Sequence, residues 1–324
     1  MKILLTSAGR RNQLLDSFRS SANALGMPLK ILAAELRPHL STACRSADEV
    51  FVVPACDSPG YIDALLEICS REKVSLLVPT IDPELGALSE SAADFAKIGT
   101  RVAISHPEAV RVARDKLATA EALAKAGLPT PRSRLLRDYL SNPTSLQGPI
   151  IAKPIAGSSS AGVIRPRGLE ELTSLPPEGY VVQEYWSGEE YTVNVFVDQS
   201  GKMVCAVPHL RLSVRSGEVS QGRTVKQAVL LAAADRLLHA LPGLRGPVCF
   251  QAIVRPDGSA GIFEVNARFG GGYPLAHEAG AHFTQWLLEE VAGLPSTASA
   301  SWEEGVLMLR YDAAFFVRDA RPPS

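Results

Sequence analysis

Apolar and polar positions along the first hundred residues alternate in a way that predicts strands separated by helices. Five short apolar runs are typical of strands, at residues 2–6, 29–34, 50–53, 75–79 and 101–104, and helical patterns lie between them. Such alternation predicts a parallel sheet with helices on both faces. Because ligands bind beyond the carboxyl ends of the strands in these sheets, the loops after the strands are candidate sites.

Two of these loops carry side chains suited to binding a ligand. The loop at residues 6–11 leads into a helix and contains Arg10, so its amides and arginines could hold an anion. The loop at residues 78–84 offers Thr80, Asp82 and Glu84. The alternative is that these groups only cap the helices that follow. The first loop has one glycine where a dinucleotide fingerprint needs three, which disfavours a nicotinamide-dependent enzyme.

Beyond residue 105 the pattern predicts helices mixed with further strands. The helices are expected at residues 106–125, 226–241 and 275–291, and in the second of them Val229, Ala233 and Leu237 should face inward. The strands are expected at residues 149–154, 180–197 with a break at 187–188, 203–208, 210–215, 222–225 and 305–317. A turn signal at residues 256–258 joins runs 249–255 and 260–267, which should pair as an antiparallel hairpin.

Three oxygen-bearing side chains of this hairpin can converge. Glu264 and Asn266 are two residues apart and share a face, and Gln251 can lie opposite them. Magnesium prefers a site in which a few protein ligands are combined with phosphate oxygens. A carboxylate facing water is the plainer interpretation, but the neighbours of Glu264 are apolar, and a buried carboxylate needs a partner charge. Arg268 continues the alternation and adds a permanent positive charge.

A glycine-rich loop follows the strand that ends in Lys153. In the loop at residues 157–163, Ser158, Ser159 and Ser160 lie between Gly157 and Gly162. The amides of such a loop can close over phosphates, with Lys153 as a point charge beside them. A solvent-exposed linker is the alternative for a glycine–serine loop alone.

The break at residues 187–188 lies between two apolar strands and can present backbone donors and acceptors to an adenine edge. Gln183, Glu184 and Trp186 lie at this break, and Glu190 lies just beyond it, where its carboxylate could accept ribose hydroxyls. The alternative is a simple hairpin with exposed acidic side chains.

Composition narrows the classes of protein. A chain of 324 residues suggests two or three domains. With 33 basic and 34 acidic residues the net charge is -1, which argues against a nucleic-acid surface. The five cysteines are scattered, as in a cytoplasmic protein with reduced thiols. No apolar run is long enough to span a membrane, so no membrane partner is expected.

Taken in order, Asp115–Lys116, Lys153 with its loop, QEYWSGEEYTV, and FQ followed by EVNARFGGG resemble the ATP-grasp superfamily, most closely its carbamoyl-phosphate synthase large-subunit-like branch. The resemblance covers most of the chain. It implies an α/β and α+β architecture, an ATP-grasp fold with a Rossmann-like pre-ATP-grasp domain at residues 1–105. An N-lobe with the phosphate loop would follow at 106–185, and a C-lobe with the metal and catalytic site at 186–324.

The resemblance also implies roles for individual residues. The implied ATP contacts are Lys116, Lys153, Ser158, Ser159, Ser160, Gln183, Glu184, Trp186 and Glu190. The implied ligands of Mg²⁺, with Mn²⁺ as an alternative, are Gln251, Glu264 and Asn266. Arg268 and Lys153 would be catalytic. Candidates for the acceptor pocket are Arg10, Thr80, Glu84, Arg211, Arg215 and Gly271.

The implied activity is that of an ATP-dependent ligase. It would activate a small carboxylate, for example an amino acid, as an acyl phosphate and join it to an amine, giving ADP and phosphate. Ala161 stands where relatives often carry a basic residue, which keeps a non-catalytic ATP-binding regulatory module as the alternative. Because one ATP-grasp unit is present where the full synthase has two, synthesis of carbamoyl phosphate by this chain alone is not expected. A homodimer is the common assembly for such enzymes.

Overall fold

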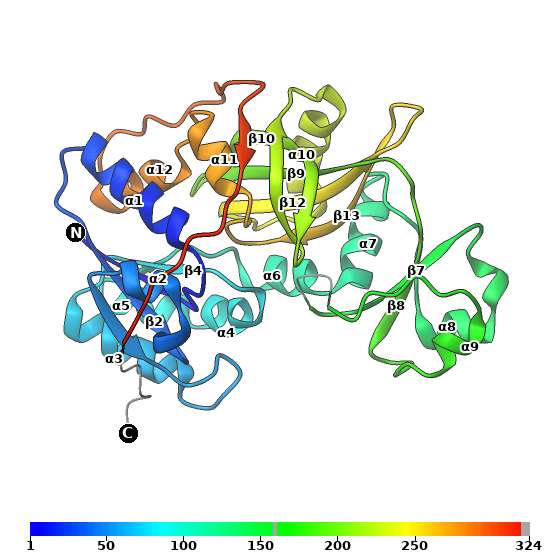
Figure 1. Ribbon diagram of the computed structural model, residues 1–324, viewed down its shortest axis with the longest axis horizontal. Helices are drawn as coiled ribbons and strands as arrows, with labels where there is room; N and C mark the ends of the chain where they lie inside the picture. Colours follow the sequence, from blue (N-terminus) through cyan, green and yellow to red (C-terminus); the bar gives the residue numbers. More distant parts are fainter. Residues whose placement is uncertain (158–160, 319–324) are drawn as a thin grey trace.

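The computed structural model describes residues 1–157 and 161–318, and its strands form three sheets (Figure 1). The first sheet is parallel, with strand order β3-β2-β1-β4-β5. Its strands are β1 (Lys2–Thr6), β2 (Lys30–Glu35), β3 (Glu49–Val52), β4 (Leu76–Pro79) and β5 (Arg101–Val102). Around them lie α1 (Asn12–Ala24), η1 (Pro38–Leu40), α2 (Thr42–Ser46), α3 (Tyr61–Glu72), η2 (Asp82–Glu84), α4 (Leu85–Glu90) and α5 (Ala92–Lys97). The predicted Rossmann-like sheet is confirmed.

Both faces of this sheet are covered, as the apolar runs require. In β1, Ile3 and Leu5 pack into one hydrophobic cluster and Leu4 packs into another. Alternate side chains of a strand point to opposite faces, so the two clusters lie on opposite sides of the sheet. Burial on both faces explains why β1 and β4 are continuously apolar.

The helix expected at residues 106–125 is two helices, so that prediction was wrong. α6 (Pro107–Arg114) ends at Asp115, and α7 (Lys116–Lys125) begins after it. The carboxylate of Asp115 accepts hydrogen bonds from the backbone N–H groups of Leu117 and Ala118, at 2.8 and 2.9 Å. An aspartate in this position caps a new helix, and here it stops the first one from continuing. Lys116 consequently lies in the first turn of α7.

A small antiparallel sheet follows, at the right of Figure 1. It contains β6 (Ser133–Leu135), β8 (Tyr180–Glu184) and β7 (Ile150–Pro154), in that order. α8 (Leu136–Ser141), η3 (Pro143–Ser145) and α9 (Leu169–Thr173) accompany it. Its core is separate and small, with six buried members that include Leu136, Tyr139 and Val182.

The third sheet is antiparallel, with order β13-β12-β9-β10-β11-β14. Its strands are β9 (Glu189–Val197), β10 (Met203–Arg215), β11 (Glu218–Thr224), β12 (Gly246–Val254), β13 (Ala260–Asn266) and β14 (Leu307–Leu309). The helices of this part are α10 (Ala228–Ala240), α11 (Tyr273–Glu278) and α12 (Phe283–Ala292). The predicted hairpin is β12 and β13, and the predicted break at residues 187–188 separates β8 from β9.

Three other expectations for this part were wrong in detail. The strands expected at 203–208 and 210–215 are one strand, β10, whose pairing with β11 shifts register between Arg211 and Val214. The helix expected at 275–291 is interrupted by Gly280, whose φ of 98° is not helical. Of the closing strands expected at 305–317, the structure has β14 alone among the described residues.

The buried face of α10 is shifted by one residue from the expectation. Leu230, Ala234 and Leu237 are fully buried, whereas Val229 and Ala233 are half-buried. Because α10 has apolar residues around most of its circumference, the sequence alone does not determine which side of the helix faces the core.

The first and third sheets share a core. Ile3 and Phe18 belong to the same hydrophobic cluster as Phe283 and Trp286 of α12, and the ring of Phe18 lies 6.1 Å from that of Phe269. The predicted domain boundaries at residues 105 and 185 remain predictions. Among the described residues, no helix combines the length and the apolar character needed to cross a membrane.

Candidate active site

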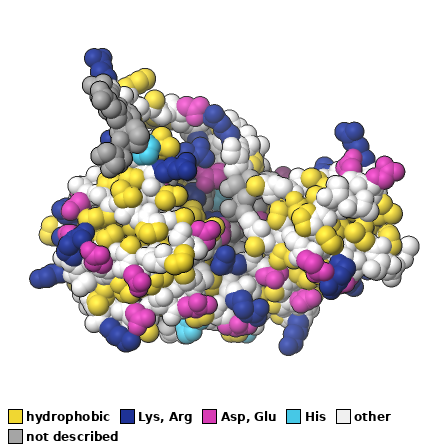
Figure 2. All heavy atoms as spheres, turned by 90° about the horizontal axis from the view of Figure 1, so that it is seen from below, with side chains coloured by type: hydrophobic (Ala, Val, Ile, Leu, Met, Phe, Trp, Pro, Cys, Tyr) yellow, Lys and Arg dark blue, Asp and Glu magenta, His cyan; other side chains and the backbone are white. Residues whose placement is uncertain are grey.

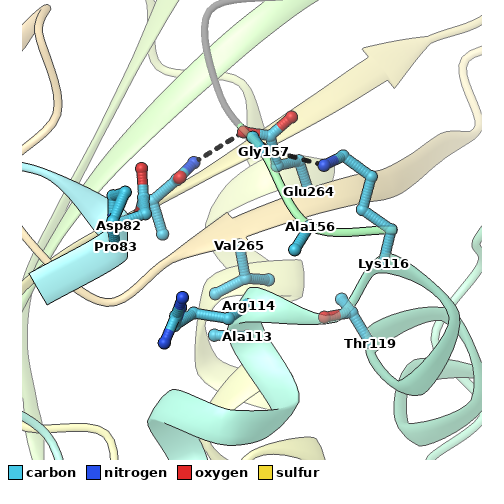
Figure 3. A pocket seen from close by; sticks show the side chains of 11 residues that line it. Asp82, Pro83, Ala113, Arg114, Lys116, Thr119, Ala156, Gly157, Glu264 and Val265 are labelled. Atoms are coloured by element: carbon cyan, nitrogen blue, oxygen red, sulfur yellow. Dashed lines mark hydrogen bonds between the residues drawn. The ribbon is translucent and has the colours of Figure 1, made fainter. Parts of the chain in front are cut away.

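Two adjoining cavities lie where the three sheets meet. The larger, of about 190 Å³, is lined among others by Lys116, Lys153, Gln183, Glu184, Trp186, Glu190, Gln251 and Glu264. The smaller, of about 50 Å³, is lined by Asp82, Pro83, Ala113, Arg114, Lys116, Thr119, Ala156, Gly157, Glu264, Val265 and Asn266 (Figure 3). Lys116, Gly157 and Glu264 line both cavities. Side chains of both charges gather in the recess on the face shown in Figure 2.

Lys153 is a buried cation at the end of β7. Its Nζ donates to Gln183 Oε1 at 2.9 Å and lies 4.7 Å from the centre of the Phe263 ring. Burial lowers the pKa of Lys153 to about 8, against the opposing effect of the Glu264 carboxylate. Gln183 donates from Nε2 to Ser133 Oγ at 3.0 Å. Both ends of the Gln183 amide are therefore engaged, and its side chain orients Lys153 rather than pointing freely to a base.

Lys116 joins α7 to the start of the glycine-rich loop. Its Nζ donates to the carbonyl oxygen of Gly157 at 3.0 Å, and its backbone N–H donates to the carbonyl oxygen of Ile155 at 3.1 Å. The two lysines enter the cavity from different elements. The predictions for Ser158, Ser159 and Ser160 fall outside the described residues.

The hairpin brings the predicted metal ligands together. Gln251 pairs with Glu264 in the register of β12 and β13, as expected, and Asn266 is two residues further on. Asn266 Nδ2 donates to Glu264 Oε1 at 3.1 Å. In the described ranges, no cluster of three or more His, Cys, Asp or Glu side chains is arranged to hold a metal. The predicted set has one carboxylate and two amides, so a cation held here would also need phosphate oxygens, which suits Mg²⁺.

Arg268 is buried beside this set and paired with the first sheet. Its guanidinium forms an ion pair with Asp82 of η2 and donates to Asn266 Oδ1 at 3.2 Å. Burial has the largest single effect and lowers the pKa of Arg268, but the Asp82 carboxylate together with Cys249 and Glu264 raises that pKa above its ordinary value. Asp82 lies in the loop whose side chains the sequence indicated, yet its partnership with Arg268 was not foreseen.

The structure does not bring Thr80 and Glu84 into either cavity. Glu84 is completely buried and accepts hydrogen bonds from the Thr80 and Ile81 amides, Ser7 and Tyr61. Burial raises the pKa of Glu84, although these donors oppose the shift. Thr80 Oγ1 donates to the Ser7 carbonyl at 2.7 Å. In the structure both residues hold the loop that carries Asp82 in place. The sequence had instead predicted that they contact the acceptor.

An ion-pair cluster that the sequence did not indicate lies beside Gly271. Glu218 on β11 pairs through one oxygen with Arg11 at 2.7 Å and through the other with Arg310 at 3.2 Å. Arg310 also donates to the Gly271 carbonyl. The residues come from four separate segments, so a charge pattern in one segment could not have revealed them. Of the four, none lines either cavity.

The other predicted acceptor residues are dispersed. Arg211 is buried, donates to Thr192 and Gly217, and lies 3.2 Å from a carboxylate oxygen of Glu190. Glu190 lines the larger cavity but already has this cationic partner. Arg10 is exposed. Arg215 is exposed too and pairs on the surface with Asp312 at 2.8 Å. Neither Arg10 nor Arg215 lines either cavity.

Comparison with known proteins agrees with this geometry. Residues 3–103 match the family model of the PylC-like N-terminal domain, and residues 113–272 match that of the ATP-grasp domain. The chain is 26% identical over 249 residues to phosphoribosylamine–glycine ligase of Synechocystis sp., covering 68% of this chain and 58% of the relative. It is 27% identical over 216 residues to 3-methyl-D-ornithine–L-lysine ligase of Methanosarcina acetivorans, covering 64% and 55%.

Solved structures share the fold. Biotin carboxylase of Campylobacter jejuni superposes with a TM-score of 0.71 at 17% identity, over 91% of this chain and 72% of that one. The fold and the two matched models define an ATP-grasp protein. The chain belongs to the ATP-grasp superfamily, with a PylC-like domain at its N-terminal side. It spans only 58% and 55% of the length of the two curated relatives named above.

Proposed function

We propose that this protein is an ATP-dependent ligase that activates a small carboxylate as an acyl phosphate and joins it to an amine, with release of ADP and phosphate. One observation carries the proposal: Lys116, Gly157 and Glu264 line both cavities. A nucleotide with its base at Glu184 and Trp186 would extend its phosphates past Lys153 and Lys116 toward Glu264. The names of both curated relatives are those of ligases, which supports the same reaction class.

The proposed nucleotide contacts follow from charge and burial. Lys153 and Lys116 would neutralise phosphate oxygens, and the low-dielectric surroundings of Lys153 strengthen that interaction. Glu190 would hold the ribose. Gln251, Glu264 and Asn266 would hold Mg²⁺, which when bound supplies charge neutralisation at the phosphates. Mn²⁺ remains an alternative.

The proposed chemistry needs no covalent enzyme intermediate. A carboxylate oxygen of the acceptor attacks the terminal phosphorus of ATP, and the bond to ADP breaks. An amine then attacks the carbonyl carbon of the acyl phosphate, phosphate leaves, and the amine loses a proton. Arg268, which is buried and bonded to Asn266 and Asp82, would stabilise negative charge on the reacting groups. Small-molecule carboxylates and amines, a cytoplasmic location and a homodimer belong to the same proposal.

A screen of carboxylate and amine pairs for ADP and phosphate release tests the proposal, with mass spectrometry of each positive pair. With a pair that reacts, Glu264→Gln should reduce ADP formation at least about 100-fold, because it removes the one carboxylate of the metal set. Glu121→Gln, an exposed position on α7, is the matched control and should be unchanged. Unaltered ADP formation in Glu264→Gln would refute the proposal. Tight ATP binding without ADP release across the panel would favour the regulatory module instead.

A further inference from the structure

Each of three consecutive residues at the base end of the larger cavity is held by an arginine from elsewhere in the chain. The pairs are Glu184 with Arg132, Tyr185 with Arg165 and Trp186 with Arg255. The first is an ion pair of 2.6 Å, and in the others the guanidinium carbon lies 3.7 and 4.4 Å from the ring centre. Guanidinium groups at these distances attract aromatic rings.

The three arginines connect this segment to two different sheets. Arg132 and Arg165 belong to the part with the small sheet, whereas Arg255 follows β12 of the six-stranded sheet. Arg255 is itself fixed by the hairpin turn, because its Nε donates to Ser259 Oγ at 2.8 Å and Ser259 donates to Asp257. Trp186 is thus attached to the six-stranded sheet through a side chain that the turn holds in place.

Gly261 on β13 supplies the surface on which the indole of Trp186 lies. A Cβ atom at this position would be 2.0 Å from Cζ3 of the indole, and two more ring atoms would be within 2.9 Å. Gly261 does not have the left-handed backbone that would require glycine, so what the site needs is space. Its strand partner Ile253 and Trp186 both line the larger cavity.

We propose that Gly261 and Arg255 are positioning residues that fix the Trp186 indole as the wall at the base end of the cavity, and thereby set the affinity for the nucleotide base. The inference rests on the proposed function in that the ligand is an adenine nucleotide. Contact between the base and the wall requires the indole to stay packed against Gly261, and a methyl group at residue 261 forces it away from the strand.

Titration with ADP, by calorimetry and by tryptophan emission, tests the proposal without requiring turnover. Gly261→Ala should weaken ADP binding on the order of tenfold, since forcing a group into a tight contact displaces its neighbours. Gly168→Ala is the matched control, because Gly168 also lacks a left-handed φ and a Cβ there meets nothing within 4 Å. Arg255→Ala should weaken ADP binding severalfold, and Arg255→Lys should restore part of the loss.

A double substitution separates this role from general destabilisation. In a Trp186→Ala background, Gly261→Ala should have no further effect on ADP affinity, because the ring that it would displace is gone. The chain has three tryptophans, and the other two, Trp286 and Trp302, are buried in the core. The emission change on ADP binding should therefore be lost in Trp186→Phe.

The outcomes distinguish this inference from the ligase proposal. If the unmodified protein binds ADP, and Gly261→Ala binds it as tightly as Gly168→Ala does, the inference is refuted and the ligase proposal stands. Additive losses in the double variant would also refute the inference. If the unmodified protein binds neither ATP nor ADP, the ligase proposal falls, and the inference falls with it.

Discussion

The two sides of the candidate site use their positive charges differently. On the nucleotide side, Lys116 and Lys153 donate to neutral oxygens, those of the Gly157 carbonyl and the Gln183 amide, and line a cavity. On the opposite side the arginines are already paired with carboxylates. Beside the predicted metal ligands Arg268 pairs with Asp82, and outside both cavities Arg11 and Arg310 pair with Glu218.

This difference indicates how each side can accept a ligand. An anion arriving at the lysines gains charge pairing without breaking an ion pair. A ligand arriving at the arginines must replace a carboxylate that is already bound, so it must bring comparable charge of its own. We therefore expect the nucleotide side to bind on its own, and the arginine side to bind a charged acceptor by exchanging partners.

Loss of Arg268 should have the largest effect. Arg268→Ala removes a buried cation and leaves Asp82 without its partner, which should cost about 3–5 kcal/mol of unfolding free energy. ADP formation with a reacting pair should fall at least about 100-fold. Urea unfolding and steady-state assays measure the two effects. The double variant Arg268→Ala/Asp82→Ala should recover stability but not activity. If activity also recovered, Arg268 would have no role in the proposed reaction.

The same carboxylate-to-amide change on each side should give opposite patterns. Asp82→Asn removes the charge that pairs with Arg268, and should change the KM of the charged acceptor about 10- to 100-fold while ADP affinity stays constant. Glu184→Gln, which weakens the ion pair with Arg132 at the base end, should weaken ADP binding and leave the acceptor KM unchanged. Equal effects of both variants on ADP binding would contradict the comparison.

Because Lys153 is buried, we expect nucleotide binding to depend on pH. Burial lowers the pKa of Lys153 to about 8, so the ammonium loses its proton as the pH rises through that value. ADP affinity, measured without metal, should fall at most about tenfold between pH 7 and pH 9. Lys153→Arg keeps its charge over this range and should give a flatter profile. The same slope in both proteins would mean that another group controls the dependence.

Arg215 should matter least. It pairs with Asp312 on the surface, where both side chains are more than two-thirds exposed, and exposed pairs contribute about 0–1 kcal/mol. Arg215→Ala should leave ADP affinity, acceptor KM and the urea midpoint unchanged within error. A raised acceptor KM would support the contact between Arg215 and the acceptor that the sequence predicted.

The sequence predicted those features that depend on local pattern. The parallel strands and the β12–β13 hairpin with Gln251 opposite Glu264 followed from alternation and a turn signal. The break at Asp115 was missed because apolar positions continue through it, and the cap that creates it depends on one side chain. The partnership of Arg268 with Asp82 joins residues 186 apart, and the buried Glu84 accepts hydrogen bonds from Ser7 and Tyr61, which are distant in sequence. Such pairings depend on tertiary packing.

The core shared by the first and third sheets has a consequence for synthesis of the chain. Ile3, Phe18 and Ile31 emerge early from the ribosome, but their packing partners in α12 and at Trp302 are translated more than 250 residues later. During most of translation this face of the first sheet is therefore covered by α1 and α2 but lacks the partners in α12 and at Trp302. Its strands can pair early, but this core can close only after the final helix has left the exit tunnel.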